Sequence, residues 1–189
     1  MPSSFRVRSS LSRGKSSTSK SSPPEDASAP IRVSREYTTR YAARAGRATE
    51  CVLNTVRLSD LYMTAIGRVW GEYGLSASAG NVLMILAGAG ESLPPHVIGE
   101  RMLVTRGAVT GLLDALEKRG YARRAPHLRD RRMLLAEVTP AGRELAQLVQ
   151  PRIVSLELEW VGCLSSEEQK AFVSLCGRLQ AGVRPVVDG

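Results

Sequence analysis

The chain has 189 residues, a hydrophobic fraction of 43% and a formal net charge of +8, values that suit a folded protein with one full core or two small lobes. No apolar run approaches the roughly 20 residues that span a bilayer, and the basic N-terminus lacks an apolar signal segment, so we expect a cytoplasmic protein with no membrane partner. Three cysteines without CxxC spacing, and two histidines outside any carboxylate-histidine cluster, argue against a disulfide scaffold and a metal site, and we expect no cofactor.

The N-terminal segment, residues 1–34, is predicted to be a disordered basic tail. Its first 30 residues include eleven serines and carry five basic against two acidic side chains. So few large apolar groups cannot bury enough surface to offset the entropy of ordering. The folded part is therefore expected to span residues 35–182.

Residues 35–74 are predicted to form one long amphipathic helix. Its apolar side chains recur at i, i+3, i+4 and i+7 from Leu58 to Tyr73, and it ends at Gly74. A second helix, capped by Ser76 or Ser78, carries apolar residues from Val82 to Leu86. A short third helix starts at Pro94-Pro95, because proline suits a first helical turn.

The fourth helix has the clearest boundaries. Thr105 is its expected N-cap, Gly120 its expected C-terminal stop, and its buried stripe comprises Val109, Leu112, Leu113 and Leu116. Two short strands follow, at 121–124 and 132–138, with a polar loop over 125–131 between them. Three short helices followed by a two-stranded hairpin predict a winged helix-turn-helix lobe over residues 76–138. The fourth helix of the chain is the second helix of its helix-turn-helix pair and is expected to enter the DNA major groove.

Basic charge is concentrated in this part of the chain. Residues 104–132 hold eight basic against three acidic side chains, whereas 31–103 together with 133–189 hold thirteen of each sign. A basic excess confined to one segment predicts a surface that faces a polyanion, here double-stranded DNA.

A fifth helix is predicted to start at Thr139-Pro140, and a sixth after the capping box of Ser165 and Glu168. Residues 35–74 and 140–182 contain more apolar side chains than one small lobe can bury, which predicts a homodimer held by these helices. The predicted fold class is thus mainly α with a small β-hairpin wing.

The DNA-reading residues are expected at the start of the fourth helix and in the wing. Arg106 is the strongest candidate for base reading, because a guanidinium can bond guanine O6 and N7 together. Further expected DNA contacts are Thr105, Gly107, Thr110, Arg129 and Arg131, with Arg129 at the wing tip, where it can enter a minor groove. Asp130 would repel phosphate, so we expect it to pair with Arg132 or Arg131 and to fix the shape of the wing.

The stretch from Asp130 to Thr139, DRRMLLAEVT, resembles the wing signature of the MarR (multiple-antibiotic-resistance regulator) family of winged-helix transcription factors. VTRGAVTGLLDALEKRGYARR is similar to its recognition helix and the following strand, and LPPHVIGERMLVT to the preceding helix. The chain departs from the family pattern at His127-Leu128 and at Pro94. The resemblance implies a homodimeric transcriptional regulator, expected to be a repressor, that is released from a near-palindromic operator by a small effector.

Two regulatory hypotheses follow from this resemblance. An aromatic effector could bind near Tyr62, Trp70 and Tyr73, although these rings also suit a plain core. Cys51 lies roughly where peroxide-sensing relatives carry a reactive cysteine, and a packing role is its alternative. A sequence-independent architectural DNA-binding protein is the other open alternative. An enzyme is not expected, because the sequence offers no nucleophile-base pair and no phosphate-binding loop.

Overall fold

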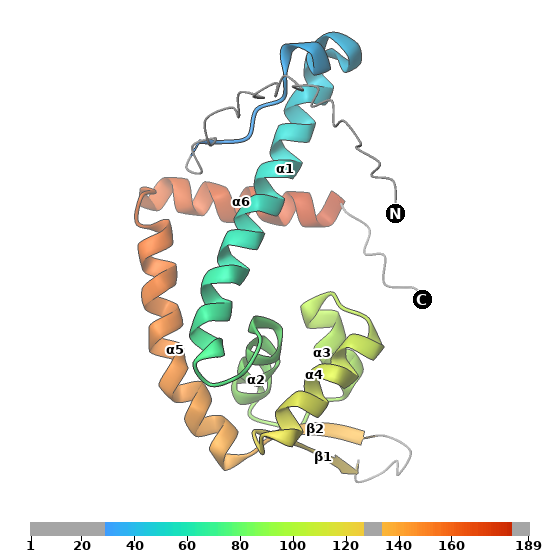
Figure 1. Ribbon diagram of the computed structural model, residues 1–189, viewed down its shortest axis with the longest axis vertical. Helices are drawn as coiled ribbons and strands as arrows, with labels where there is room; N and C mark the ends of the chain where they lie inside the picture. Colours follow the sequence, from blue (N-terminus) through green and yellow to red (C-terminus); the bar gives the residue numbers. More distant parts are fainter. Residues whose placement is uncertain (1–28, 127–133, 183–189) are drawn as a thin grey trace, which may run out of the picture. The chain divides into compact units, whose positions relative to one another are not determined.

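The computed structural model describes residues 29–126 and 134–182, and the chain divides into two compact units, Met1–Asn54 and Thr55–Gly189 (Figure 1). The elements are α1 (Arg35–Gly71), α2 (Ala77–Ala89), α3 (Pro95–Met102), α4 (Arg106–Lys118), β1 (Ala122–Pro126), β2 (Leu134–Val138), α5 (Pro140–Val161) and α6 (Ser166–Gly182). This arrangement confirms the predicted fold class of helices with a two-stranded antiparallel hairpin. Within the described ranges, none of the helices has the length and hydropathy that crossing a bilayer requires.

The first unit contains a fold-back that the sequence pattern did not predict. α1 is broken at Ala42, whose backbone has φ 68° and ψ 155°. The segment before the break returns along the helix, where the Asn54 side chain accepts from the Ile31 N–H and donates to the Ile31 carbonyl. Glu50 accepts from the Val33 N–H at 3.0 Å. Residues 29–34, expected to belong to a disordered tail, are therefore held against α1, whereas residues 1–28 lie outside the described residues.

Helix starts in the second unit follow the predicted caps. Ser76, Thr105 and Thr139 each accept a hydrogen bond from the backbone N–H three residues later. Ser165 and Glu168 form the reciprocal capping box at the start of α6. These side chains satisfy N–H groups that the first helical turn leaves without partners.

The core of the second unit contains buried side chains from α1, α2, α3, α4 and α5, and the largest of its fully buried side chains is that of Trp70. Trp70 packs directly on α2, because Gly80 has no side chain to hold the ring away. Leu112, predicted in the buried stripe of α4, is only partly buried. α1 ends at Gly71 rather than Gly74, since the chain turns at Gly74 with φ 67°.

The first strand of the hairpin extends further toward the loop than predicted, to Pro126 instead of Arg124. β1 pairs antiparallel with β2 in a register that runs from Ala122 opposite Val138 to Pro126 opposite Leu134. Ala125 and Pro126, expected in the loop, therefore belong to the strand, and proline is tolerated there because it occupies the strand end. Leu93 adds a further antiparallel bridge to Ala136 through bonds of 2.8 and 2.9 Å. The segment before α3 is thus joined to the wing.

Candidate nucleic-acid interface

The N-terminal half of α4 is open to solvent. Thr105 caps the helix and Arg106 occupies its first position, with an exposed side chain. Within the described part of the chain, the Arg106 guanidinium has no hydrogen-bonding or ionic partner. An unpaired cation at a helix N-terminus, where backbone N–H groups also face outward, suits an anionic partner.

Two glycines leave this face of α4 without side chains at their positions. A β-carbon built at Gly107 or Gly111 would meet no atom within 4 Å. Glycine is disfavoured inside a helix by up to about 1 kcal/mol relative to alanine. Thr110, between them, is exposed and donates its hydroxyl to the Arg106 carbonyl at 3.1 Å.

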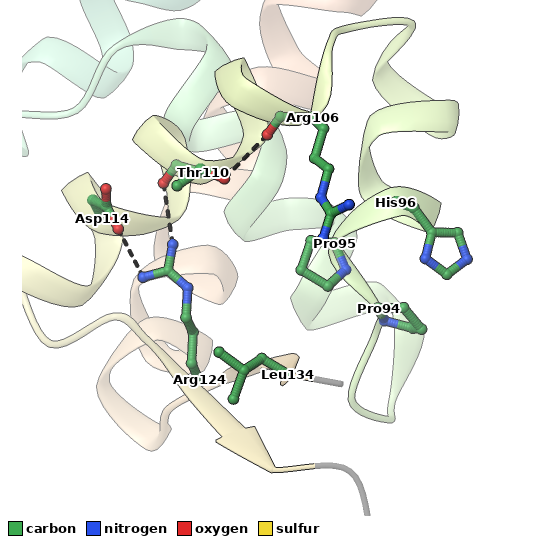
Figure 2. A pocket seen from close by; sticks show the side chains of 8 residues that line it. All are labelled: Pro94, Pro95, His96, Arg106, Thr110, Asp114, Arg124 and Leu134. Atoms are coloured by element: carbon green, nitrogen blue, oxygen red, sulfur yellow. Dashed lines mark hydrogen bonds and ion pairs between the residues drawn. The ribbon is translucent and has the colours of Figure 1, made fainter. Parts of the chain in front are cut away.

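A hollow of about 600 Å³ separates α4 from α3 and the wing, as Figure 2 shows. Three residues one helical turn apart, Arg106, Thr110 and Asp114, form its α4 wall. Arg124 of β1 reaches into it from the opposite side. The remaining lining residues are Pro94, Pro95, His96 and Leu134. This hollow is large enough to receive part of a polar ligand or a nucleic-acid strand, beside one unpaired guanidinium.

Three arginines of the basic segment have structural partners, which sequence reasoning did not assign. The Arg119 guanidinium donates to the Tyr73 carbonyl at 3.3 Å. Arg123 pairs with Glu137 on the facing strand at 2.7 Å. Bonds from Arg123, and then from the Ser92 hydroxyl, hold the pKa of Glu137 below its ordinary value.

Arg124, the third of these arginines, is bound to α4 through Asp114 and Glu117. Because these arginines are paired within the protein, fewer positive charges of the segment are available to DNA than its net charge indicates. The alternation of side chains along a strand places Arg123 and Arg124 on opposite faces, which indicates that they have different partners. It does not identify these partners, because they are distant in sequence.

The predicted wing contacts lie outside the described residues. This applies to Arg129 and Arg131, to the pair formed by Asp130 and Arg132, and to His127 and Leu128. Their roles stay predictions. The described strands place both ends of this segment next to the hollow, since Pro126 pairs with Leu134.

The three aromatic residues predicted near an effector site have different environments. Trp70 is fully buried, and its Nε1 has no hydrogen-bond partner among the described residues. The Tyr62 hydroxyl donates to Glu157 at 2.8 Å, and its ring lies 5.3 Å from that of Trp160. The Tyr73 hydroxyl accepts from Arg152. An effector role for these rings stays a prediction.

Cys51 has an exposed side chain on α1, in the first unit. Exposure is one requirement for a redox-active thiol, and a lowered thiol pKa is the other. A sensing role for Cys51 therefore also stays a prediction.

Comparison with known proteins places these features in context. Residues 73–133 match a family model described as MarR family. The transcriptional regulator PecS of Dickeya dadantii is 31% identical over 126 residues, which cover 66% of this chain and 76% of PecS. The transcriptional repressor YetL of Bacillus subtilis is 28% identical over 145 residues, 76% of this chain and 87% of YetL.

Solved structures share the fold. The MepR–DNA complex of S. aureus superposes with a TM-score of 0.62 at 18% identity, covering 67% of this chain and 93% of MepR. CouR from Rhodococcus jostii RHA1, bound to p-coumaroyl-CoA, gives a TM-score of 0.59 at 19% identity, covering 71% and 92%.

Proposed function

The chain belongs to the MarR family of winged helix-turn-helix transcriptional regulators, and from this premise we propose that it is a repressor that binds a near-palindromic operator as a homodimer and leaves it when a small effector binds. The observation that carries the proposal is the exposed start of α4, where Arg106, which has no partner among the described residues, lies beside a hollow lined by α3, α4 and the two strands. The relative YetL is named a repressor, and MepR was solved with DNA.

In this proposal α4 is the recognition helix. Arg106 reads a guanine through O6 and N7, while Thr105 and Thr110 contact neighbouring bases or phosphates. Gly107 lets the helix approach the base edges closely. Arg129 and Arg131 bind DNA from the wing, and Asp130 with Arg132 fixes the shape of the wing.

Dimer formation is supported by apolar side chains that the single chain leaves exposed. α6 has no buried residue, although it carries Phe172, Leu175 and Leu179 at i, i+3 and i+7. On α5, Leu158 is 66% exposed. Apolar stripes of this kind need a partner surface, and a second copy of the chain offers the same stripes related by a two-fold axis.

An aromatic effector is supported by the CouR structure and by Trp70. Among the described residues the buried Trp70 N–H has no acceptor, which is costly inside a protein, and a carboxylate or hydroxyl oxygen of a ligand could supply one. Thermal-shift measurements with 4-hydroxyphenylacetate as the probe test this idea. We expect a stabilising shift for the wild type and none for Trp70→Phe, which keeps an aromatic ring but has no N–H. Equal shifts for both proteins would remove Trp70 from the effector site.

The deciding experiment for the proposed function is a binding titration at physiological salt with two duplexes: the DNA upstream of the protein's own gene, and a scrambled duplex of the same length and composition. A sequence-specific regulator should prefer the first by about 10³-fold or more. Equal affinity for both would favour a sequence-independent architectural protein. As a regulator of transcription, the protein is proposed to act in the cytoplasm.

A further inference from the structure

Arg124 of β1 is bound to α4 at three successive points. Its Nη1 donates to Asp114 Oδ1 at 2.7 Å and to the Glu117 carboxylate, and its Nη2 donates to the Thr110 carbonyl at 3.2 Å. The backbone N–H of Arg124 also donates to Glu117, at 2.6 Å. One strand residue thereby spans two turns of the recognition helix, and its side chain lines the hollow (Figure 2).

The residues of this network differ in the exposed fraction of their side chains. The Arg124 side chain is only 23% exposed, whereas Asp114 is 60% exposed and lines the hollow in line with Arg106 and Thr110. A carboxylate on that wall would repel the phosphates of a DNA strand seated there. The guanidinium of Arg124 supplies the compensating positive charge, and its bonds to Glu117 and the Thr110 carbonyl hold it beside Asp114.

We propose that Arg124 is a positioning residue for DNA binding that acts through Asp114: it neutralises and holds this carboxylate, so that a DNA strand can lie against Arg106 and Thr110. The inference rests on the proposed function, since it concerns the same interface. It assigns Arg124 a different role from Arg106. Arg106 offers an unpaired guanidinium to DNA, whereas that of Arg124 is occupied inside the protein.

The adjacent arginine provides a matched control. Arg123 forms an ion pair of the same length, 2.7 Å, with Glu137, but its side chain is 70% exposed and it does not line the hollow. Successive strand residues point to opposite faces, so Arg123 and Arg124 have the same side chain but lie on opposite faces of the hairpin. Loss of either arginine removes one positive charge, but loss of Arg123 breaks one ion pair and loss of Arg124 breaks two.

The experiment compares Arg124→Ala, Asp114→Asn, the double variant and Arg123→Ala in the full chain. Fluorescence anisotropy measures affinity for the chain's own upstream duplex and for the scrambled duplex, and thermal unfolding is followed on the same samples. We expect Arg124→Ala to weaken binding by about tenfold or more, because Asp114, the more exposed of the two carboxylates that Arg124 pairs with, then lacks this positive partner at the interface. Asp114→Asn alone should stay within about threefold of wild type, and the double variant should return to the affinity of Asp114→Asn.

A salt series adds a second readout. The loss caused by Arg124→Ala should shrink as salt rises from about 0.05 M to about 0.5 M, since the repulsion is then screened. Arg123→Ala should weaken binding no more than about threefold at any salt. A purely structural role for Arg124 would instead give a loss that tracks the melting temperature and persists in the double variant.

Several results would overturn the inference. A double variant as weak as Arg124→Ala would mean that Arg124 contacts DNA itself or serves only stability, and an unchanged affinity for Arg124→Ala would mean that Asp114 needs no compensation. If Arg124→Ala does not fold, Arg124→Gln carries the same comparison, because glutamine can donate to Asp114 but cannot neutralise it. The proposed function fails separately, if the wild type does not distinguish the two duplexes.

Discussion

The first turn of α5 lies directly against the carbonyl group of Tyr121, and Gly142 makes this contact possible. A β-carbon at Gly142 would overlap the Tyr121 oxygen and lie 2.9 Å from its carbonyl carbon. Thr139 reinforces the contact, since its N–H donates to the Tyr121 carbonyl at 3.1 Å and its hydroxyl donates to the Gly120 carbonyl at 2.6 Å. The end of α4 is thereby joined to the start of α5.

Gly142→Ala should therefore destabilise the second unit. The added β-carbon is fixed to the backbone of Gly142 and would overlap the backbone of Tyr121, so no side-chain rotation can relieve the clash. We therefore expect a loss of about 2 kcal/mol or more in the free energy of unfolding. Urea unfolding followed by circular dichroism measures it. Gly88→Ala is the matched control, because a β-carbon there meets no atom within 4 Å, and it should stabilise by roughly 0.5 kcal/mol. Similar effects for both substitutions would contradict the close packing at Gly142.

This contact illustrates which parts of the structure the sequence can predict. Helix starts at Ser76, Thr105, Thr139 and Ser165 depend on bonds to groups three residues away, so local pattern is sufficient to find them. The packing of Gly142 on Tyr121 joins neighbouring elements through their backbones, and neither residue type signals it. Such packing is decided by tertiary structure rather than by local preference.

Polar pairings across longer separations were also beyond sequence reasoning. The Asn54 side chain binds Ile31, 23 residues earlier, and Arg124 binds Asp114, ten residues earlier. A charge pattern shows that arginines are numerous, but it does not show which of them have carboxylate partners. The charge pattern identifies the basic segment as unusual. The structure was needed to separate the arginines that have partners within the protein from Arg106, which has none among the described residues.

Arg106→Ala should relax base preference at the operator. Removing the guanidinium would take away the proposed bidentate contact to guanine, and such a contact is worth about 1–3 kcal/mol of discrimination. Arg129→Ala, in the wing, should instead weaken binding more uniformly across sequences. Competition titrations with operator duplexes mutated one base pair at a time measure both effects. Unchanged base preference in Arg106→Ala would mean that the recognition helix has been placed wrongly.

Leu175→Asp should dissociate the proposed dimer. Leu175 is 51% exposed at the centre of the apolar stripe on α6, and a carboxylate buried there in a dimer would lack a partner. Sedimentation velocity over a range of protein concentrations measures the state of assembly. Ser174→Asp is the control, since it adds the same charge next to the stripe and should leave the dimer intact. A wild type that sediments as a monomer at all concentrations would refute the dimer itself.

Ala42→Gly should stabilise the fold-back in the first unit. Ala42 has φ 68° and ψ 155°, a region that only glycine occupies readily, and non-glycine residues there carry a strain of order 1–3 kcal/mol. Part of this gain is offset by the greater freedom of glycine in the unfolded chain, which leaves about 1 kcal/mol. Amide hydrogen exchange over residues 31–54 should therefore slow. Ala48→Gly, in regular helix, should accelerate exchange, and acceleration in both variants would show that Ala42 is not strained.

Tyr62 should titrate far above an ordinary tyrosine. Burial, and secondly its hydrogen bond to Glu157, raise the pKa of Tyr62 from 10.0 to about 12. A folded-state pKa above the unfolded value means that the contribution of Tyr62 to stability is complete below about pH 10 and is lost as the pH rises toward 12. The physical reason is that a tyrosinate can no longer donate to Glu157 and instead repels it.

The ultraviolet absorbance of tyrosinate measures this directly, as the difference between the titration of the wild type and that of Tyr62→Phe, with circular dichroism confirming that both remain folded. Glu157→Gln keeps an acceptor but removes the negative charge, so it should lower the pKa of Tyr62 only partly, because burial is the larger cause. A difference curve centred near pH 10 would mean that Tyr62 is solvated and that the packing of α1 against α5 at Glu157 is open in solution.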